Sequence, residues 1–306
     1  MGKIAFVFSG QGAQYGGMGK ELYDSCESVR ALYDAAEDIR KGTKKQSFEG
    51  SAEELKITSN TQPCMYLADL GAALALRENG IEPEGAAGFS LGEIAALAFA
   101  GAYSPEDGFK IVTQRGLLMQ KASEEKETAM AAVMKIDSET IKSVCEKVGG
   151  VYPVNFNSPA QTVVAGEADS VARFKEAMSE YKCRIVDLAV AGGFHSPFMN
   201  SAAEGMRAVL AEFDIRTPQI PVYANRTAQP YGENVSETLL EQINNPVLWQ
   251  TTIENMVKDG FDTFIETGVG KVLSGLIKKI APDAKVYNVE NAETLAQTIE
   301  AVKNNG

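Results

Sequence analysis

Residues 85–103 read GAAGFSLGEIAALAFAGAY, and residues 88–92 within them fit the G-x-S-x-G pattern of a nucleophile elbow. In that motif a serine occupies a strained turn between a strand and a helix, and the flanking glycines relieve the crowding around it. The Ala/Gly stretch before Ser90 and the Ala/Leu-rich run at 91–100 predict this strand and a buried helix. Ser90 therefore falls at a helix N-terminus, where free backbone N–H groups can stabilise an oxyanion. A Gly/Ser turn leading into a core helix is the alternative for so short a motif.

The chain contains a single histidine, His195. A serine hydroxyl is a weak nucleophile at neutral pH and needs an adjacent base, which in most enzymes is an imidazole. If an imidazole activates Ser90, it must be that of His195, because the sequence offers no other. A packed structural histidine is the alternative role.

Length and composition are those of an ordinary soluble globular protein. With 306 residues, 44% of them hydrophobic and 23% charged, the chain can form one large domain or two unequal ones. The net charge of −12 argues against nucleic acid or an anionic membrane as the main partner. The four cysteines are scattered without a C-x-x-C motif, which predicts neither a zinc site nor a disulfide framework. With no recognisable signal peptide and no apolar run of membrane-spanning length, the expected location is the cytoplasm.

Apolar strands alternate with helices along most of the chain, which predicts an α/β fold with a parallel sheet covered on both faces. Residues 129–190 differ, since their expected order is βαββαβ, the ferredoxin-like pattern. We therefore expect a large α/β-hydrolase-like catalytic domain with a parallel-sheet core, formed by residues 1–128 and 191–306. Residues 129–190 are expected to be an inserted small ferredoxin-like subdomain. His195 follows the last inserted strand, which places it at an interdomain cleft, a favoured location for ligand sites.

A glycine-punctuated loop at residues 9–14 (SGQGAQ) follows the first predicted strand. Two glycines after a strand can begin a dinucleotide-binding fingerprint, but Tyr15 stands where that pattern requires Gly or Ala. A phosphate-binding P-loop is also excluded, because Lys271 is followed by Val272 rather than by Ser or Thr. The loop at 9–14 is predicted to contribute backbone and amide donors, with a simple strand-to-helix turn as the alternative.

Short motifs spread over nearly the whole chain resemble those of the malonyl-CoA:acyl carrier protein transacylases and the related acyltransferase domains of polyketide and fatty acid synthases. In sequence order they are GQGAQ at 10–14, GFSLGE at 88–93, QRG at 114–116, NFNSP at 155–159, FHS at 194–196, PVLW at 246–249 and GVGKVL at 268–273. Each motif is weak alone, but their common order and spacing are specific. The resemblance implies transfer of malonyl from malonyl-CoA to the phosphopantetheine thiol of acyl carrier protein in fatty acid biosynthesis, with no metal or redox cofactor.

The resemblance also assigns catalytic roles to residues at matching positions. Ser90 corresponds to the nucleophile that becomes malonylated, and His195 corresponds to its general base. Gln11 and the Leu91 backbone N–H match the oxyanion hole, and Gln242 matches a glutamine whose backbone carbonyl orients the histidine. These roles fit a ping-pong reaction through a serine ester, in which a backbone carbonyl replaces the carboxylate of a triad.

Three further residues correspond to substrate-binding positions of the family. Arg115 matches the arginine that pairs with the malonyl carboxylate, a task for which a guanidinium fork is suited and lysine is not. An arginine on a helix surface is the alternative. Asn157 falls in a pocket-lining motif, and Phe194 resembles the form associated with selection of malonyl over methylmalonyl groups. Phe89 departs from the family, which often has histidine there, and we expect it to change packing or pocket hydration rather than mechanism.

Three other functions remain open at this point. A serine esterase or thioesterase of the α/β-hydrolase type would also carry G-x-S-x-G. Those enzymes usually place their histidine near the C-terminus and often carry an H-G-G-G motif, which this chain lacks. A non-catalytic docking module conflicts with the intact Ser90, His195 and Arg115. A malonyl transferase that serves a polyketide assembly line fits the same residues equally well.

Docking of a carrier protein presents an electrostatic problem. The carrier proteins of this pathway are typically acidic, and this chain is acidic too, so the two molecules repel each other at long range. Docking should therefore use a local basic patch near the cleft. Lys271, Lys278 and Lys279 are the candidates, and a solvated helix face is the alternative.

Overall fold

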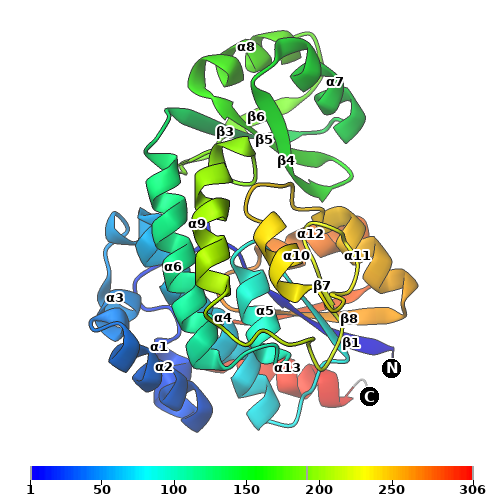
Figure 1. The fold of residues 1–306 in the computed structure, drawn as a ribbon. Coiled ribbons are helices and arrows are strands. Elements are labelled where there is room, and N and C mark those ends of the chain that lie inside the picture. Colours follow the sequence, from blue (N-terminus) through cyan, green and yellow to red (C-terminus); the bar gives the residue numbers. More distant parts are fainter. Residues whose placement is uncertain (1, 191, 305–306) are drawn as a thin grey trace.

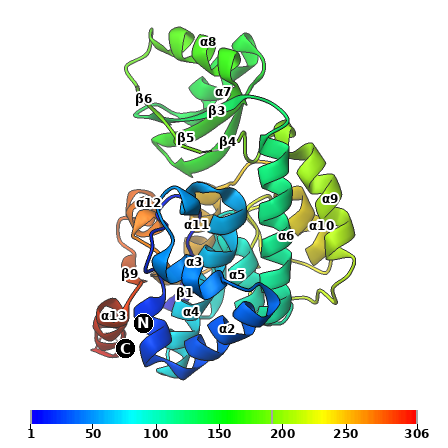
Figure 2. The same cartoon turned by 90° about the vertical axis from the view of Figure 1, so that its left-hand side faces the viewer.

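A computed structural model describes residues 2–190 and 192–304 of the chain. Two sheets occupy separate parts of the molecule, with the smaller sheet and its two helices stacked above the larger part (Figure 1). The first strand (residues 3–8) and the last helix (residues 292–304) lie near each other in the lower part of the molecule (Figures 1 and 2). No helix within the described ranges is long and apolar enough to cross a membrane.

The larger sheet has five parallel strands in the order β7-β2-β1-β8-β9. Their bounds are β1 (Lys3–Phe8), β2 (Gly85–Gly88), β7 (Val222–Tyr223), β8 (Phe261–Thr267) and β9 (Lys285–Val289). In the register, Phe8 at the end of β1 lies beside both Gly88 of β2 and Thr267 of β8. The loops that leave these three strands therefore meet at one edge of the sheet, the usual place for a site in a parallel sheet.

Helices cover both faces of this sheet because side chains along a strand point alternately to opposite sides. Phe6 and Phe8 of β1 pack into the cluster formed with α2, α4, α5, α6 and α9, whereas Ala5 and Val7 pack against α11 and α12. The helices of this part are α1 (Lys20–Ser25), α2 (Glu27–Ile39), α3 (Thr43–Glu49), η1 (Glu54–Lys56), α4 (Thr58–Glu78), α5 (Gly92–Phe99), α6 (Pro105–Ser123), η2 (Pro197–Met199), α9 (Asn200–Leu210), α10 (Val235–Glu241), α11 (Trp249–Lys258), α12 (Val272–Ile280) and α13 (Ala292–Asn304).

The smaller sheet is antiparallel and has the strand order β4-β5-β3-β6. Its elements follow one another as β3 (Thr128–Met134), α7 (Ser138–Val148), β4 (Val151–Ser158), β5 (Gln161–Glu167), α8 (Ala168–Met178) and β6 (Arg184–Asp187), which confirms the succession expected from the sequence. One face packs on α7 and α8 around a separate apolar cluster that includes Val133, Val164 and Phe174. The antiparallel sheet thus has its own core, and its linkers to the larger part run beside α6 and α9 (Figure 2).

Several expected helix boundaries were wrong, although the elements themselves are present. Helical periodicity and a first-turn proline in the sequence predict a helix from Pro63 to Asn79, but in the structure this helix begins at Thr58, and Pro63 lies inside it. A proline there removes one intrahelical hydrogen bond without ending the helix, because the surrounding residues of α4 are buried and held by packing. The sequence also shows helical periodicity around residues 20–40, and the structure has two helices there, separated at Cys26, whose backbone is extended. Apolar periodicity continues across that break and therefore gave no sign of it.

Candidate active site

Ser90 occupies a sharp turn between β2, which ends at Gly88, and α5, which begins at Gly92. Its φ of 54° is in the left-handed region, which is unfavourable for a residue other than glycine. A Cβ at Gly88 would lie 2.1 Å from the backbone of Gly92, and one at Gly92 would lie 2.3 Å from the Phe8 carbonyl oxygen. Both glycines of the motif are therefore required by close backbone contact. The strained turn is held in place by Asn225, whose Oδ1 accepts a 2.7 Å hydrogen bond from the Ser90 N–H.

His195 lies directly against this serine. Its Nε2 is 2.7 Å from Ser90 Oγ, and its Nδ1 is 2.9 Å from the backbone carbonyl oxygen of Gln242. Because a carbonyl can only accept, Nδ1 carries the proton, and Nε2 of a neutral imidazole is left to accept the Ser90 hydroxyl proton. Burial, followed by the positive charge of Arg115, lowers the pKa of His195 to about 4. The imidazole is thus a neutral base at physiological pH.

Arg115 of α6 is buried beside the same hydroxyl, with only 2% of its surface exposed. Its Nη1 donates to Gln62 Oε1 at 2.8 Å, and its Nη2 donates to Gln242 Oε1 at 2.8 Å and to Ser90 Oγ at 3.2 Å. Burial lowers the pKa of Arg115 to about 10, so the guanidinium stays charged at neutral pH. Its Nε is buried and has no acceptor among the described residues. Nε is thus the guanidinium nitrogen left without an acceptor, and Nη2, on the same edge of the fork, already donates to Ser90 Oγ.

A buried hydrogen-bond network behind these residues centres on Gln242. Its side-chain Nε2 donates to the Ser90 carbonyl oxygen at 2.7 Å and to Glu93 Oε2 at 2.9 Å, while its Oε1 accepts from Arg115. Glu93 also accepts from the Asn225 backbone N–H at 3.2 Å and from the Tyr231 hydroxyl. Burial raises the pKa of Glu93 to about 7. Gln242 consequently contacts the serine, the histidine and the arginine at once.

The oxyanion-hole candidates lie at the same edge of the sheet. The backbone N–H groups of Gln11 and Leu91 donate no hydrogen bond within the described part of the chain. Both residues line a cavity that also contains Ser90 and His195. Two unpaired donors beside a nucleophile are what an oxyanion requires.

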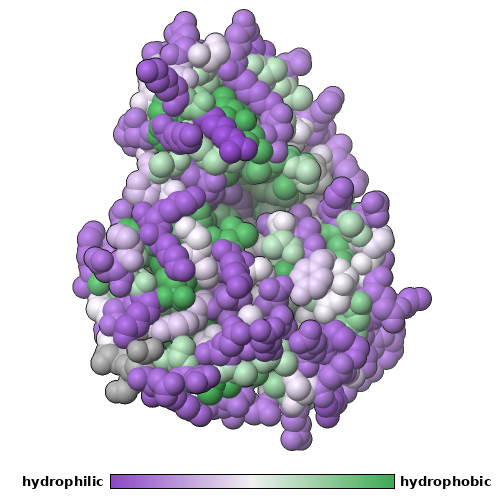
Figure 3. Space-filling view, turned by 180° about the vertical axis from the view of Figure 1, so that it is seen from behind, coloured by the Kyte–Doolittle hydropathy of each residue, from purple (hydrophilic) through white to green (hydrophobic). Residues whose placement is uncertain are grey.

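Two adjoining cavities lead to Ser90 from the recess between the two parts of the molecule, which Figure 3 shows from behind. The inner cavity, of about 100 Å³, is lined by Arg115, Phe194 and His195 among others, and the outer one measures about 260 Å³. Asn157 lines the outer cavity only, whereas Asn155 from the same motif lines both. The inner cavity is small and polar at one end, so it suits a short acyl group with a negative charge.

Phe89, at the departure from the family pattern, lines both cavities. Its ring packs edge-on against buried Trp249, with 5.5 Å between the ring centroids. The side chain at this position thus packs with an aromatic neighbour and forms part of the wall of both cavities.

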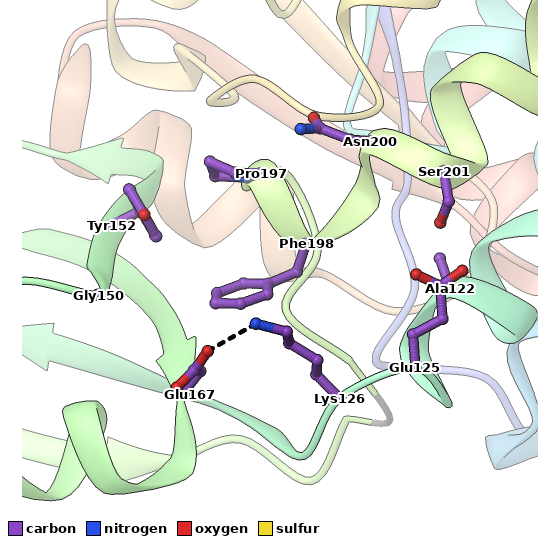
Figure 4. A pocket seen from close by; sticks show the side chains of 10 residues that line it. All are labelled: Ala122, Glu125, Lys126, Gly150, Tyr152, Glu167, Pro197, Phe198, Asn200 and Ser201. Atoms are coloured by element: carbon purple, nitrogen blue, oxygen red, sulfur yellow. Dashed lines mark hydrogen bonds and ion pairs between the residues drawn. The ribbon is translucent and has the colours of Figure 1, made fainter.

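A larger cavity, of about 550 Å³, lies away from this chemistry at the junction with the antiparallel sheet (Figure 4). Lys126 donates to Glu167 at 2.9 Å across it, and the Phe198 ring lies beside the ammonium group. Neither Ser90 nor His195 lines this cavity. The described residues also contain no cluster of three or more His, Cys, Asp or Glu side chains placed to hold a metal ion.

Comparison with known proteins agrees with the geometry. The family model of the acyl transferase domain matches residues 5–303, which is nearly the whole chain. The chain belongs to the acyl transferase family. This acyl transferase is 40% identical over 312 residues to the malonyl CoA-acyl carrier protein transacylase of Bacillus subtilis strain 168, with 99% of this chain and 98% of the relative covered.

Solved structures of similar proteins have the same fold. The malonyl CoA-acyl carrier protein transacylase of Clostridium perfringens superposes with a TM-score of 0.95 at 35% identity, covering 99% of this chain and 98% of its own. A malonyl-transacylase solved in complex with a type II polyketide acyl carrier protein has a TM-score of 0.93 at 33% identity, covering 98% and 99%. The enzyme also resembles the Bacillus subtilis polyketide biosynthesis transacylase PksC, at 37% identity over 92% of this chain and 98% of the relative.

The structure brings together most of the residues singled out from the sequence. Ser90, His195, Arg115 and Gln242 contact one another, and Gln11, Leu91 and Phe194 line the same inner cavity. Sequence reasoning missed four polar residues of the network, namely Gln62, Glu93, Asn225 and Tyr231. Glu93 ends the GFSLGE motif at 88–93, and Gln62 directly precedes Pro63. Asn225 and Tyr231 belong to no recognisable motif.

Proposed function

We propose that this acyl transferase moves a malonyl group from malonyl-CoA to the phosphopantetheine thiol of an acyl carrier protein in fatty acid biosynthesis, through an ester on Ser90. The observation that carries the proposal is the buried Arg115 guanidinium, 3.2 Å from Ser90 Oγ, with its Nε unpaired. A fixed cation at the end of a small cavity favours an acyl group that ends in a carboxylate. The similarity to transacylases named for malonyl-CoA supports the same substrate.

In the first half-reaction, Ser90 Oγ attacks the thioester carbonyl while its proton passes to His195 Nε2. The backbone N–H groups of Leu91 and Gln11 stabilise the tetrahedral oxyanion. Collapse of this intermediate breaks the C–S bond, and the departing coenzyme A thiolate takes the proton from His195. The carrier thiol then repeats these steps in the opposite sense. A positioned base contributes about 10²–10⁴-fold, and one oxyanion donor about 10²–10³-fold.

Arg115 and Phe194 would select the acyl group. The malonyl carboxylate would take the free Nε–H of Arg115 together with the Nη2–H that now meets Ser90 Oγ, as a bidentate pair. Gln62 and Gln242 hold the rest of the fork and so fix its plane. Phe194 occupies the cavity wall and would exclude the extra methyl of methylmalonyl, while Asn157 in the outer cavity would bind the part of the donor nearer the solvent.

The need for cofactors, the location of the enzyme and its division into domains can be inferred on similar grounds. Exchange of an acyl group between two thiols changes no oxidation state, and we infer that it needs neither a metal nor a redox cofactor. We infer a cytoplasmic enzyme without nucleic acid or membrane partners, from its acidic composition. We also infer an α/β-hydrolase-like large domain (1–128 and 191–306) with a ferredoxin-like insertion (129–190), supported by the strand orders of the two sheets.

The direct test is mass spectrometry of the intact protein after brief incubation with malonyl-CoA or acetyl-CoA, followed by addition of a holo-acyl carrier protein. A malonyl adduct that forms in preference to acetyl and disappears as the carrier gains malonyl supports the proposal. Rapid thioester hydrolysis without an adduct would instead identify a thioesterase. Neither adduct nor turnover would leave only a docking module.

A polyketide carrier is the second candidate acceptor, favoured by the similarity to PksC and to the transacylase solved with a polyketide carrier protein. The same experiment distinguishes the two if fatty acid and polyketide carrier proteins are offered at equal concentration. Faster transfer to the polyketide carrier would assign the enzyme to that pathway.

The lowered pKa of His195 predicts an unusual pH profile for serine acylation. A histidine with the ordinary pKa of 6.5 would be half protonated at that pH, but burial beside Arg115 lowers the pKa of His195 to about 4. The rate of malonyl-adduct formation should therefore stay level from pH 8 to about 5 and fall only near pH 4. Because the unfolded chain binds this proton first, folding stability should decline as the pH falls from 6.5 toward 4. Rapid-quench mass spectrometry at a series of pH values measures the profile.

Glu93 is the control for this experiment, since its pKa is raised to about 7 by burial and it lies in the same network. A step in rate near pH 7 that vanishes in Glu93→Gln belongs to Glu93 and leaves the assignment of His195 intact. A decline centred at pH 6.5 that persists in Glu93→Gln would contradict it.

The basic residues near α12 lead to a prediction about docking. Lys271, Lys278 and Lys279 are exposed, and α12 also supplies part of the wall of the outer cavity through Leu273 and Leu276. Reversing two charges with Lys278→Glu and Lys279→Glu should raise the KM for the carrier protein about 2- to 30-fold at low salt, because an exposed ion pair contributes about 0.2–1 kcal/mol. The effect should shrink at high salt, and acylation by malonyl-CoA should be unchanged.

Lys41→Glu combined with Lys45→Glu is a matched control, since these exposed lysines lie near α3, on another part of the molecule (Figure 1). An unchanged KM for the carrier after reversal at Lys278 and Lys279, or an equal change in the control, would place docking elsewhere.

A further inference from the structure

Asp69, on α4, is a completely buried carboxyl group that the proposed mechanism does not use. Its Oδ1 accepts a 2.7 Å hydrogen bond from Ser9 Oγ, and its Oδ2 has no hydrogen-bond partner among the described residues. Burial raises the pKa of Asp69 well above its ordinary value, against the opposing effect of the hydrogen bonds from the Ser9 hydroxyl and the Val269 backbone. The carboxyl group is thus held in the protein interior, where burial favours its protonated form.

Ser9 connects this carboxyl group to the loop at residues 9–14, here called the oxyanion loop because it contains Gln11. It is the first residue after β1 and stands two positions before Gln11, in a loop with glycine at positions 10 and 12. Its backbone touches the nucleophile elbow, since a Cβ at Gly92 would lie 2.4 Å from the Ser9 carbonyl oxygen. Glycines give the loop conformational freedom, so its position depends on the contacts at its base. The Ser9 hydroxyl is the side-chain contact there.

The same carboxyl group also packs against the loop after β8. Gly268 has a φ of +103°, and a Cβ at this position would lie 1.7 Å from Asp69 Oδ1 and 3.0 Å from Ser9 Oγ. The next residue, Val269, lines the outer cavity. Asp69 therefore lies where the ends of β1 and β8 meet, beneath two loops that border the route to Ser90.

We propose that Asp69 is a positioning residue that acts through Ser9 to hold the oxyanion loop, and with it the Gln11 backbone N–H, at the nucleophile elbow. The inference rests on the proposed function only in taking the Gln11 N–H as an oxyanion donor. An oxyanion donor works only when it is preorganised at the position where charge develops, and losing one donor costs about 10²–10³-fold in rate. A loosened loop would lose part of this effect without changing how substrate is bound.

Ser9→Ala and Asp69→Asn are the informative variants, because Asp69→Ala can fail simply by creating a cavity. An asparagine is neutral, has the same shape and can still accept the Ser9 hydrogen bond through its oxygen. Thr298→Ala is the matched control: Thr298, on α13, is also buried, its hydroxyl donates one hydrogen bond, to the Asn288 carbonyl oxygen, and it lines neither of the two cavities at Ser90. Thermal unfolding of all variants shows how much each substitution destabilises the fold.

The rate of Ser90 acylation is measured with malonyl-CoA and, in parallel, with p-nitrophenyl acetate, an acyl donor that needs the oxyanion hole but not Arg115. Ser9→Ala should lower kcat for acylation by both donors about 10-fold, with KM for malonyl-CoA unchanged and a loss of stability equal to that of Thr298→Ala. Asp69→Asn should stay within about 3-fold of the wild-type rate, since it keeps the hydrogen bond. Wild-type protein that reacts with the ester but not with malonyl-CoA would contradict the proposed function while leaving this inference testable.

Wild-type acylation rates in Ser9→Ala, with the stability loss of the control, would overturn the inference, because Ser9 and Asp69 would then be purely structural. A large rate loss in Asp69→Asn without loss of stability would overturn it too, since the hydrogen-bond acceptor is retained there. In the double variant Ser9→Ala/Asp69→Asn, the rate should equal that of Ser9→Ala alone, as expected for two residues acting through one contact.

Discussion

Ser90→Ala should lose on the order of 10⁴-fold or more of its malonyl transfer rate, because it removes the hydroxyl that contacts His195 Nε2 in the turn before α5. Without this nucleophile no covalent intermediate can form, and the two thioesters cannot exchange through a ping-pong route. The fold should persist, since among the described residues the hydroxyl hydrogen-bonds only to His195 and Arg115. Mass spectrometry of the intact protein should show no malonyl adduct, and a coupled assay with carrier protein should show the loss of turnover.

Ser201→Ala is the matched control, because Ser201 lies on α9 and lines the cavity of about 550 Å³ at the junction with the antiparallel sheet (Figure 4), which His195 does not line. It should retain the wild-type adduct and rate. A malonyl adduct that persists in Ser90→Ala would show that another residue is acylated, and the mechanism proposed for this enzyme would be wrong.

Arg115→Ala should lower kcat/KM for acylation by malonyl-CoA about 10²–10³-fold, since removing one partner of a buried charge pair costs about 2–5 kcal/mol. Acetyl-CoA has no carboxylate to lose, so its rate should be little changed and the preference for malonyl should disappear. Arg115→Lys should restore little of this preference, because an ammonium group cannot form the bidentate pair. Loss of the donor also leaves the buried oxygens of Gln62 and Gln242 unpaired, which should lower the melting temperature.

A further readout, the pH profile of acylation, separates the role of this charge from a structural one. Arg115 is the second cause of the lowered His195 pKa, so in Arg115→Ala the acidic limb of the acylation profile should move from about pH 4 toward higher pH. Arg207→Ala is the control, since Arg207 is exposed and pairs with Glu237 on the surface. If Arg115→Ala lowers the melting temperature as expected but keeps the preference for malonyl-CoA over acetyl-CoA, Arg115 is not a carboxylate clamp.

The nucleophile elbow could be predicted from sequence because its causes are local. Gly88 and Gly92 stand two residues to either side of Ser90, and the contacts that require them involve backbone atoms of the turn and of the adjoining strand. The presence of one histidine made its pairing with the serine a simple inference, and the structure places the two within 2.7 Å. The succession of elements at 129–190 was also predictable, since strand and helix periodicities are properties of short segments.

The surroundings of the site had to come from tertiary structure. Asn225 binds the Ser90 N–H from 135 positions away, and Gln242 reaches the Ser90 carbonyl from 152 positions away. Neither distance in sequence nor residue type indicates such contacts, because Asn and Gln are also common in turns and on helix surfaces. A helix starting at Pro63 would leave Gln62 outside it, so the sequence did not indicate that Gln62 faces Arg115. That contact depends on α4 and α6 packing together.

Residue order alone thus determined the chemistry that the chain can perform: a serine on a strained turn, one imidazole and an arginine. Tertiary structure decided which charges those groups carry. Glu93 and Asp69 look like any surface carboxylates in the sequence, yet burial raises the pKa of both, while it lowers that of His195. The physical reason is that steric and periodic constraints act over a few residues, whereas desolvation depends on every segment that covers a group.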